Sequence, residues 1–585
     1  PVVNRANSIF GPIVPLDSSA EIVARSPVVP VDAGVPLIIG GLVEAAASDR
    51  TWVVANYNGK IDSPKILNQT ISADEAHTLA RGETPANARL AAYWDFSHGI
   101  SARGMLTDTI VDVSGNQLNG RGINQPEGAM TGWNWRGIEE VFTHAPEQYG
   151  ALWFHEDALD DCRWESDCSL EIPATLRSGC YAVRLRKGMA EDYIPFFVRP
   201  APGKTSSRIL LLIPTCSYLA YANGQIVQSA AIGQAVIGHV PVLGDRDLEL
   251  HSRLGYYGWS TYDHYVDGQG VSFTSWRRPI LNMRPKHRQE FGSLWQFPAD
   301  LDIVDWLEAR GHHYDVATDH DLIREGAALL SKYRLVLTGT HPEYYTRSMV
   351  EAWEDYLCEG GRGIYLGANG LYWIASTHPE KPWLMEVRKG ENGARAWQAR
   401  PGEYYHSTSG ERGGLWRNRA RAANKVWGTG FSSFGFDHCG YYVPMPDARD
   451  PRVAWIMKDI EDEQRLGDFG LVGGGAAGYE TDCYDLTIGT PPHTLLIAGS
   501  EGHSENYPLV NEYVYFPYPG MNGRESPMVR ADIVYFSTPK GGGVFSVSSI
   551  SFAGSLSHNN YENNISTMLD NVVRQLSSDQ PAPEV

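Results

Sequence analysis

The stretch Arg334–Tyr345, with the sequence RLVLTGTHPEYY, places two chemically useful side chains directly after an apolar run. Leu335–Leu337 has the composition of a short buried strand. His341 and Glu343 follow it two residues apart, so in extended backbone both side chains point the same way. Open α/β sheets build their sites at the carboxyl ends of strands, so an imidazole and a carboxylate at this position predict a functional site.

Other polar side chains follow further predicted strands. The segment PTCSYLAYAN comes after Ile209–Ile213, an asparagine comes after Gly363–Leu366, and STYDHYVDGQG lies in a long excursion between them. The residues concerned are Cys216, Tyr218, Tyr221, Asn223, Tyr262, Asp263, His264, Asp267 and Asn369. A crevice formed here would be rich in phenols and carboxylates. Any single one of the 30 tyrosines is far more often structural, so only the grouping favours a site.

The elements that must position these groups alternate between strand and helix. The predicted strands are Ile209–Ile213, Tyr314–Thr318, Leu335–Leu337, Gly363–Leu366, Thr494–Ala498, Ile533–Phe536 and Val544–Val547. The predicted helices are Asp300–Arg310 with Asp300 as N-cap, one capped by Thr346, and Asn563–Leu576. This order is typical of a parallel sheet with helices on both faces, which predicts a doubly wound α/β domain.

A chain of 585 residues exceeds what one hydrophobic core usually serves, so two to four domains are expected. The amino-terminal part has short alternating stretches typical of β structure, with one helix at Ser72–Arg81 capped by Ser72. The predicted divisions are a β domain at 1–112, a connector at 113–150, a small β-sandwich at 151–205 and the α/β domain at 206–585. The last contains the loop insertion 214–297, and loops of that length usually have a function.

Composition excludes several classes of function. The net charge of −20 argues against nucleic-acid binding, which requires clustered Lys and Arg. No uncharged apolar run reaches the roughly 18–20 residues of a membrane span. The seven cysteines include no C-x-x-C pair and no zinc spacing, which favours free thiols in a reducing compartment and a cytoplasmic location.

A cysteine nucleophile is one alternative for the site. Cys216 near His341 would make a papain-like or glutaminase-like amidase. A nucleophile normally lies on a sharp strand-to-helix turn flanked by glycine, and Cys216 has no adjacent glycine. This alternative is therefore the less favoured one.

Several motifs, in one order along the chain, resemble the large subunit of N,N-dimethylformamidase. They are LAYAN at 219–223, STYDHYVDGQG at 260–270, GTHPEYYT at 339–346, YLGANGLYW at 365–373 and SLSHNN at 555–560. WDFS at 94–97, DVSGNQLNG at 112–120 and MTGWNW at 130–135 resemble the tail of that family's laminin-G-like β domain, here expected to be incomplete. The resemblance implies a β-sandwich of that type and a small β domain, followed by a flavodoxin-like or glutamine-amidotransferase-like α/β domain.

The resemblance also implies a mononuclear, non-haem Fe³⁺ centre. Tyr221 and Tyr262 would be its phenolate ligands and Glu343 its carboxylate ligand. The other implied site residues are His341, Asn369, Lys389 and Glu480 as catalytic groups and Phe516 as an apolar wall for the substrate. The family pairs this large subunit with a small helical subunit, and two such pairs form the basic assembly.

Elementary chemistry agrees with this set of residues. A ferric ion is hard and highly charged and suits anionic oxygen donors. A free tyrosine has a pKa of about 10, so the cation would have to hold each phenol deprotonated. The ion would act as a Lewis acid on a small amide and on water, with Glu480 or His341 transferring protons. The expected reaction is cleavage of N,N-dimethylformamide to dimethylamine and formate.

Two other functions stay open at this point. The β domains and the α/β domain could form a carbohydrate-binding protein without a catalytic metal, with aromatic side chains stacking on sugars. A related amidase could instead act on another small amide, because the sequence does not distinguish a dimethyl from a diethyl or cyclic formamide. Iron content per chain separates the carbohydrate-binding protein from the iron enzyme.

Overall fold

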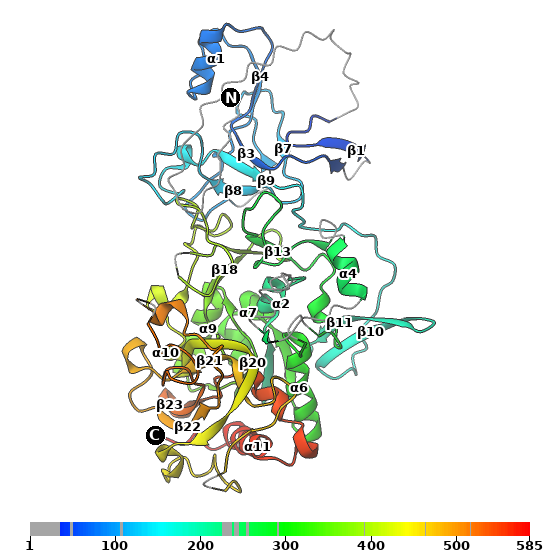
Figure 1. Ribbon diagram of the computed structural model, residues 1–585. Helices are drawn as coiled ribbons and strands as arrows, with labels where there is room; N and C mark the ends of the chain where they lie inside the picture. Colours follow the sequence, from blue (N-terminus) through cyan, green and yellow to red (C-terminus); the bar gives the residue numbers. More distant parts are fainter. Residues whose placement is uncertain are drawn as a thin grey trace.

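The computed structural model describes residues 36–46, 51–105, 109–224, 237–238, 245–252, 257–288, 292–390, 392–461, 464–514, 516 and 518–585. Residues 1–35 of the predicted β domain and parts of the predicted insertion 214–297 therefore lie outside the described residues. Figure 1 shows a β-rich part, blue to cyan, above a larger α/β part, green to red.

A nine-stranded mixed sheet forms the centre of the α/β part. Its order is β14 (Asp315–Thr318), β12 (Ile209–Ile213), β15 (Leu335–Thr338), β17 (Arg362–Tyr365), β24 (Gly542–Ser546), β23 (Asp532–Thr538), β22 (Leu495–Glu501), β20 (Gly430–Pro444) and β21 (Ala477–Cys483). The first five strands are parallel and the others pair antiparallel. All seven predicted strands exist, but an all-parallel sheet is wrong, because β22 and β23 run antiparallel to their neighbours.

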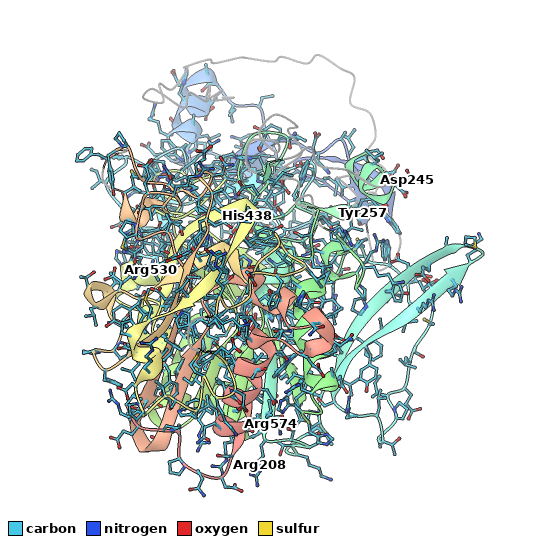
Figure 2. The ribbon with its side chains drawn as sticks, turned by 60° about the horizontal axis from the view of Figure 1, so that its bottom comes forward. Arg208, Asp245, Tyr257, His438, Arg530 and Arg574 are labelled. Atoms are coloured by element: carbon cyan, nitrogen blue, oxygen red, sulfur yellow. The ribbon has the colours of Figure 1, made fainter. Side chains whose placement is uncertain are left out.

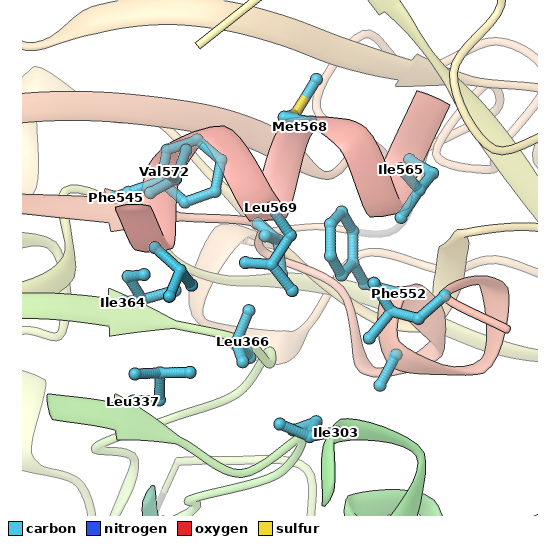
Figure 3. Close-up of a cluster of buried hydrophobic side chains, with 14 of the residues drawn as sticks. Ile303, Leu337, Ile364, Leu366, Phe545, Phe552, Ile565, Met568, Leu569 and Val572 are labelled. Atoms are coloured by element: carbon cyan, nitrogen blue, oxygen red, sulfur yellow. The ribbon is translucent and has the colours of Figure 1, made fainter. Parts of the chain in front are cut away.

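Helices cover both faces of the parallel half. Alternate side chains of the strands point to opposite faces, so each strand contributes to two separate cores. One face packs against α6 (Phe297–Ala309) and α11 (Asn564–Ser577), and the other against α7 (Asp319–Glu325), α8 (Ala327–Leu330) and α9 (Arg347–Cys358). Figure 3 shows Leu569 of α11 facing the sheet residues Ile364 and Leu366. This layering confirms the prediction for the parallel half.

Two of the three predicted helix caps are confirmed. The hydroxyls of Ser72 and Thr346 accept hydrogen bonds from backbone N–H groups three residues later, at 3.2 and 3.4 Å. The cap at Asp300 is wrong, because a proline in the first turn allows α6 to begin earlier, at Phe297. Asp300 is buried and accepts hydrogen bonds from Tyr218 Oη and from the backbone N–H of Thr340. It therefore ties α6 to the loop after β15.

A second, four-stranded sheet borders the carboxyl ends of the parallel strands. Its order is β13 (Phe273–Ser275), β19 (Leu384–Val387), β18 (Trp373–Thr377) and β16 (Tyr344–Tyr345). The strand β16 follows the loop after β15 directly, which places this sheet beside the predicted crevice. The other α-helices among the described residues of this part are α2 (Thr215–Ala220), α4 (Asp245–Ser252) and α10 (Asn424–Trp427).

In the amino-terminal part, the described residues form small antiparallel sheets and one α-helix. They are β1 (Leu42–Ala46) with β2 (Thr51–Val54), β4 (Lys65–Leu67) with β5 (Leu90–Tyr93), β6 (Thr109–Ile110) with β7 (Gly120–Arg121), β3 (Gly59–Asp62) with β9 (Ala151–Phe154) and β8 (Glu127–Met130), and the helix α1 (Ala73–Ala80). Two predicted boundaries differ from this arrangement. Strands β7 and β8 lie within the predicted connector, and β9 pairs with β3 rather than belonging to a separate domain.

The small sandwich predicted over 151–205 is a single two-stranded ribbon, β10 (Gly179–Lys187) and β11 (Ala190–Val198). The segment between β9 and β10 forms no strand, because its polar sequence lacks alternation. Figures 1 and 2 show the ribbon reaching out from the body. Its base packs on α6, with the Phe197 and Phe297 rings edge to face and 5.7 Å between centroids.

The cysteines and the helices bear on two of the predictions from composition. All seven cysteines are free thiols. None of the described helices is long and apolar enough to cross a bilayer.

Candidate active site

Seven of the predicted site residues meet beside the carboxyl ends of the parallel strands. They are Tyr221 after α2, Tyr262 in the insertion, His341 and Glu343 after β15, Asn369 after β17, Lys389 after β19 and Glu480 within β21. Tyr221 is half-buried and the other six are buried. The site thus combines loops from the parallel half with one strand from the antiparallel half of the sheet.

Three oxygen-bearing side chains form a hydrogen-bonded row. Tyr221 Oη donates to Tyr262 Oη at 2.8 Å, and Tyr262 Oη donates to Glu343 Oε1 at 2.9 Å. The two phenol rings stack, with centroids 4.5 Å apart. Asn369 Nδ2 donates to the same Glu343 oxygen at 3.2 Å. The other oxygen, Oε2, is buried and accepts no hydrogen bond within the described part of the chain.

An imidazole–carboxylate pair lies beside this row. His341 Nε2 is 2.9 Å from Glu480 Oε2 and 3.5 Å from Glu343 Oε2. Gln296 Nε2 lies 3.1 Å from His341 Nδ1. When this amide donates to Nδ1, the proton of the neutral imidazole is on Nε2 and faces the carboxylates. Burial lowers the pKa of His341, but Glu480 and Glu343 together raise it above its usual value. The pair is suited to taking up and returning a proton.

Burial strongly shifts the pKa values of two charged side chains at the site. Burial raises the pKa of Glu343 to about 7, although His341 and Lys389 oppose the shift. Burial lowers the pKa of Lys389 to about 7. Its Nζ lies 3.2 Å from the centroid of the Tyr262 ring and forms no hydrogen bond among the described residues. Such shifts are typical of functional sites.

Asp482 is a part of the site that sequence analysis missed. Its carboxylate accepts hydrogen bonds from the Asn369 backbone N–H at 2.7 Å and from Tyr365 Oη at 2.8 Å. Asn369 and Leu371 have positive φ angles of 51° and 54°, a strained backbone that needs such support. Asp482 therefore holds the Asn369 amide towards Glu343. The signal was present, since Glu480 and Asp482 are two residues apart on one strand and share a face.

The other candidate residues from the sequence lie outside this cluster or form hydrogen bonds with the backbone of the surrounding loops. Phe516 is 77% exposed, and no described contact joins it to the cluster. Asn223 Nδ2 donates to the Tyr257 and Pro279 carbonyls, and Asp263 accepts from the Ser260 N–H, so both shape the loops around the site. His264 is exposed.

Cys216 does not have the surroundings of a nucleophile. It is fully buried in the first turn of α2, and burial together with Asp319 raises the pKa of its thiol well above the usual value. A catalytic cysteine needs the opposite shift, because the thiolate is the reactive form.

We expect Cys216→Ala to lose about 1 kcal/mol of stability and to keep its amide-hydrolysing activity. Steady-state rates of the purified variant test this, and loss of activity in a folded variant would restore the cysteine mechanism.

Asp319 predicts a pH-dependent stability. Its carboxylate accepts the Cys216 backbone N–H at 3.0 Å, and burial raises its pKa to about 8. The unfolded chain loses this proton at about pH 4, so stability contributed by the protonated form is full below pH 4 and lost as the pH rises to 8. Asp319→Asn should therefore stabilise the protein by about 1–3 kcal/mol at pH 8 and by less at pH 5. Denaturant unfolding at both pH values measures the difference, and an equal effect at both would disprove the assignment.

The site residues fit a hard trivalent cation. Two phenol oxygens and one carboxylate oxygen lie in one hydrogen-bonded row, and the second, buried Glu343 oxygen accepts no hydrogen bond among the described residues. Burial and Glu343 raise the pKa of Tyr221 and Tyr262 well above 10, so only a bound cation would hold them as phenolates. No group of three or more His, Cys, Asp or Glu side chains that could hold a metal ion occurs in the described ranges.

Buried titratable side chains gathered at the edge of a mixed α/β sheet are typical of an enzyme active site. A family model described as "N,N-dimethylformamidase beta subunit-like, C-terminal" matches residues 127–563. The N,N-dimethylformamidase beta subunit of Paracoccus aminophilus is 60% identical over 585 residues, which are 100% of this chain and 77% of the relative. The beta subunit from Alcaligenes sp is 59% identical with the same coverage. The chain belongs to the N,N-dimethylformamidase beta subunit family and is homologous to an amidohydrolase.

A solved structure of a ThuA-like protein from Bacteroides uniformis aligns with 50% of this chain and 89% of its own, at 11% identity and a TM-score of 0.27. A likeness this weak supports no inference about fold or function.

Proposed function

We propose that this chain is the catalytic large subunit of an iron-dependent amidohydrolase that cleaves N,N-dimethylformamide to formate and dimethylamine. Tyr221, Tyr262 and Glu343 would hold one Fe³⁺ ion. The observation that supports this most directly is the row of three hydrogen-bonded oxygens beside the His341–Glu480 pair. The 60% identity to an N,N-dimethylformamidase beta subunit supports the same substrate.

The ferric ion would supply Lewis-acid polarisation of the amide carbonyl and of water. Glu480 takes a proton from the attacking water while the water oxygen bonds to the carbonyl carbon. Asn369 and Lys389 are placed to donate to the oxyanion that develops. His341 then donates its Nε2 proton to the amide nitrogen and regains a proton from Glu480, whose Oε2 lies 2.9 Å from Nε2, so that both groups return to their starting forms. The C–N bond breaks, and the formic acid and amine products exchange a proton to give formate and dimethylammonium.

Aromatic side chains around the cluster suit N-methyl groups. The Trp295 ring lies edge to face with the Tyr221 and His341 rings, at 6.1 and 5.2 Å between centroids. These rings are mostly buried and do not form an exposed platform, which argues against the carbohydrate-binding alternative. An apolar wall of this kind gives little binding energy to a charged substrate.

The experiment that tests this function measures iron per chain together with the visible absorption spectrum. The wild-type protein should bind one iron and show a tyrosinate-to-iron band, and Tyr262→Phe should lose most of both. Tyr442→Phe is the matched control, because this buried phenol donates to the Val547 carbonyl within the sheet core. A colourless, iron-free wild type that still hydrolyses N,N-dimethylformamide would overturn the proposal.

We also propose the finer assignments of fold and assembly. The amino-terminal sheets would be a laminin-G-like remainder, and the α/β part would be of the flavodoxin or glutamine-amidotransferase type. Both relatives are called beta subunits, which supports assembly with a small helical subunit into pairs that dimerise. The seven free thiols agree with a cytoplasmic location.

A further inference from the structure

The loop that contains Tyr262 is hydrogen-bonded to the amino-terminal β region on both sides of this tyrosine. Trp259 Nε1 donates a hydrogen bond of 2.7 Å to Asp157 Oδ2, and the backbone N–H of Val266 donates to the same oxygen at 3.0 Å. Asp157 lies three residues after β9 and is 4% exposed. One carboxylate oxygen of the β region therefore joins two points on either side of Tyr262.

A second set of contacts lies at the far side of the same loop. Asp267 Oδ2 accepts a hydrogen bond of 2.9 Å from Trp153 Nε1 and lies 3.2 Å from His155 Nδ1. The His155 ring stacks on Tyr265, with centroids 3.9 Å apart and an angle of 15° between planes. Because Trp153 belongs to β9 and His155 follows it, the strand end contacts the loop repeatedly.

The middle of the loop is attached instead to the α/β part. The Thr261 backbone N–H donates to the Ala220 carbonyl at 2.9 Å, next to Tyr221, and Trp397 Nε1 donates to the Thr261 carbonyl at 2.8 Å. Tyr262 extends from this point to Glu343. Its hydroxyl position thus depends on anchors in both parts of the protein.

Burying the Asp157 carboxylate costs free energy unless its oxygens accept hydrogen bonds. Its second oxygen, Oδ1, accepts no hydrogen bond within the described residues, and burial raises the pKa of the group. A buried acceptor of this kind costs free energy, and it is retained where its hydrogen bonds hold another segment in position. Figure 1 shows β9 in the lower part of the β-rich region, above β13 and the loops around it.

We propose that Asp157 is a positioning residue for the iron site: through Trp259 and Val266, the amino-terminal β region sets the place of the Tyr262 hydroxyl relative to Glu343. This inference rests on the proposed function. It makes the β region a working part of the active site, although every proposed ligand lies in the α/β part.

The test compares three variants of the full chain in its native assembly. Asp157→Ala removes the acceptor. Asp157→Asn keeps an oxygen in the same place and is the conservative rescue. Asp112→Ala is the matched control, because Asp112 is a buried carboxylate of the same β region that accepts the Tyr93, Ser114 and Leu118 backbone N–H groups and contacts no site residue.

The readouts are hydrogen–deuterium exchange of peptides covering 257–270, the iron band, and kcat and KM for N,N-dimethylformamide. Asp157→Ala should speed exchange in this loop, shift or weaken the band, and lower kcat/KM by about 10- to 100-fold, mostly in kcat. Asp157→Asn and Asp112→Ala should resemble the wild type in all three.

Two outcomes would overturn the inference. One is an Asp157→Ala variant with wild-type exchange, band and kcat. The other is an equal loss of all three in Asp112→Ala, which would indicate general destabilisation of the β region. If the wild type itself lacks iron and amidase activity, the proposed function fails, whereas the exchange comparison still decides whether Asp157 holds the loop.

Discussion

Replacing Glu343 by glutamine should abolish iron binding and lower kcat/KM for N,N-dimethylformamide by at least about 100-fold. Glutamine keeps an oxygen that can accept from Tyr262 Oη and Asn369 Nδ2, so the local geometry survives. It removes the negative charge that a trivalent cation requires beside two phenols. Burial already raises the pKa of Glu343 to about 7, so the iron-free variant should be at least as stable as the iron-free wild type above that pH.

Iron per chain, the visible band and thermal unfolding of the same sample measure this result. Asp532→Asn is the control, because it neutralises a fully buried carboxylate outside the cluster, one that lies in β23 and pairs with Arg530. The control should keep its iron and its activity. Full activity and stoichiometric iron in Glu343→Gln would remove Glu343 from the ligand set.

Replacing Glu480 by glutamine should separate proton transfer from metal binding. Its Oε2 lies 2.9 Å from His341 Nε2, and it takes no part in the row that joins Tyr221, Tyr262 and Glu343. We therefore expect kcat to fall by about 100- to 10,000-fold while iron content and the visible band stay at wild-type values. Single-turnover rates and metal analysis of one preparation test both parts of the prediction.

Loss of iron together with activity in Glu480→Gln would instead place this residue among the ligands. Wild-type activity would show that another group accepts the water proton. Glu480→Asp is an informative companion, since it retains the charge and shortens the reach to His341, so partial activity with full iron content is expected.

The parallel half of the fold was predictable because its strands are continuous apolar runs. Ile209–Ile213 and Leu335–Leu337 need no partner information to be identified, since strands buried on both faces have this composition. The polar residues that follow the second of these strands include His341 and Glu343. Tyr221 and Tyr262 are different, because among 30 tyrosines no local signal distinguishes them, and only the resemblance to a family singled them out.

The remaining errors share a physical cause, which is that long-range pairing decides the structure. Strands β20 and β21 contain several glycines and pair with each other through register shifts, so neither shows clear alternation. Strand β9 was assigned to a separate domain, whereas it pairs with β3 some 90 residues earlier. The spacing from Glu480 indicates that Asp482 shares its face of the strand, but the role of Asp482 depends on its meeting the strained backbone at Asn369, which the sequence does not show.

The position of β24 in the sheet has a consequence for when the enzyme becomes competent during its synthesis. This strand lies between β17 and β23 and joins the parallel half to the antiparallel half, yet it follows every other strand in the sequence. His341 belongs to one half and Glu480 to the other. We therefore expect that a nascent chain on the ribosome cannot bring the two together until β24 has emerged, after translation has passed residue 546.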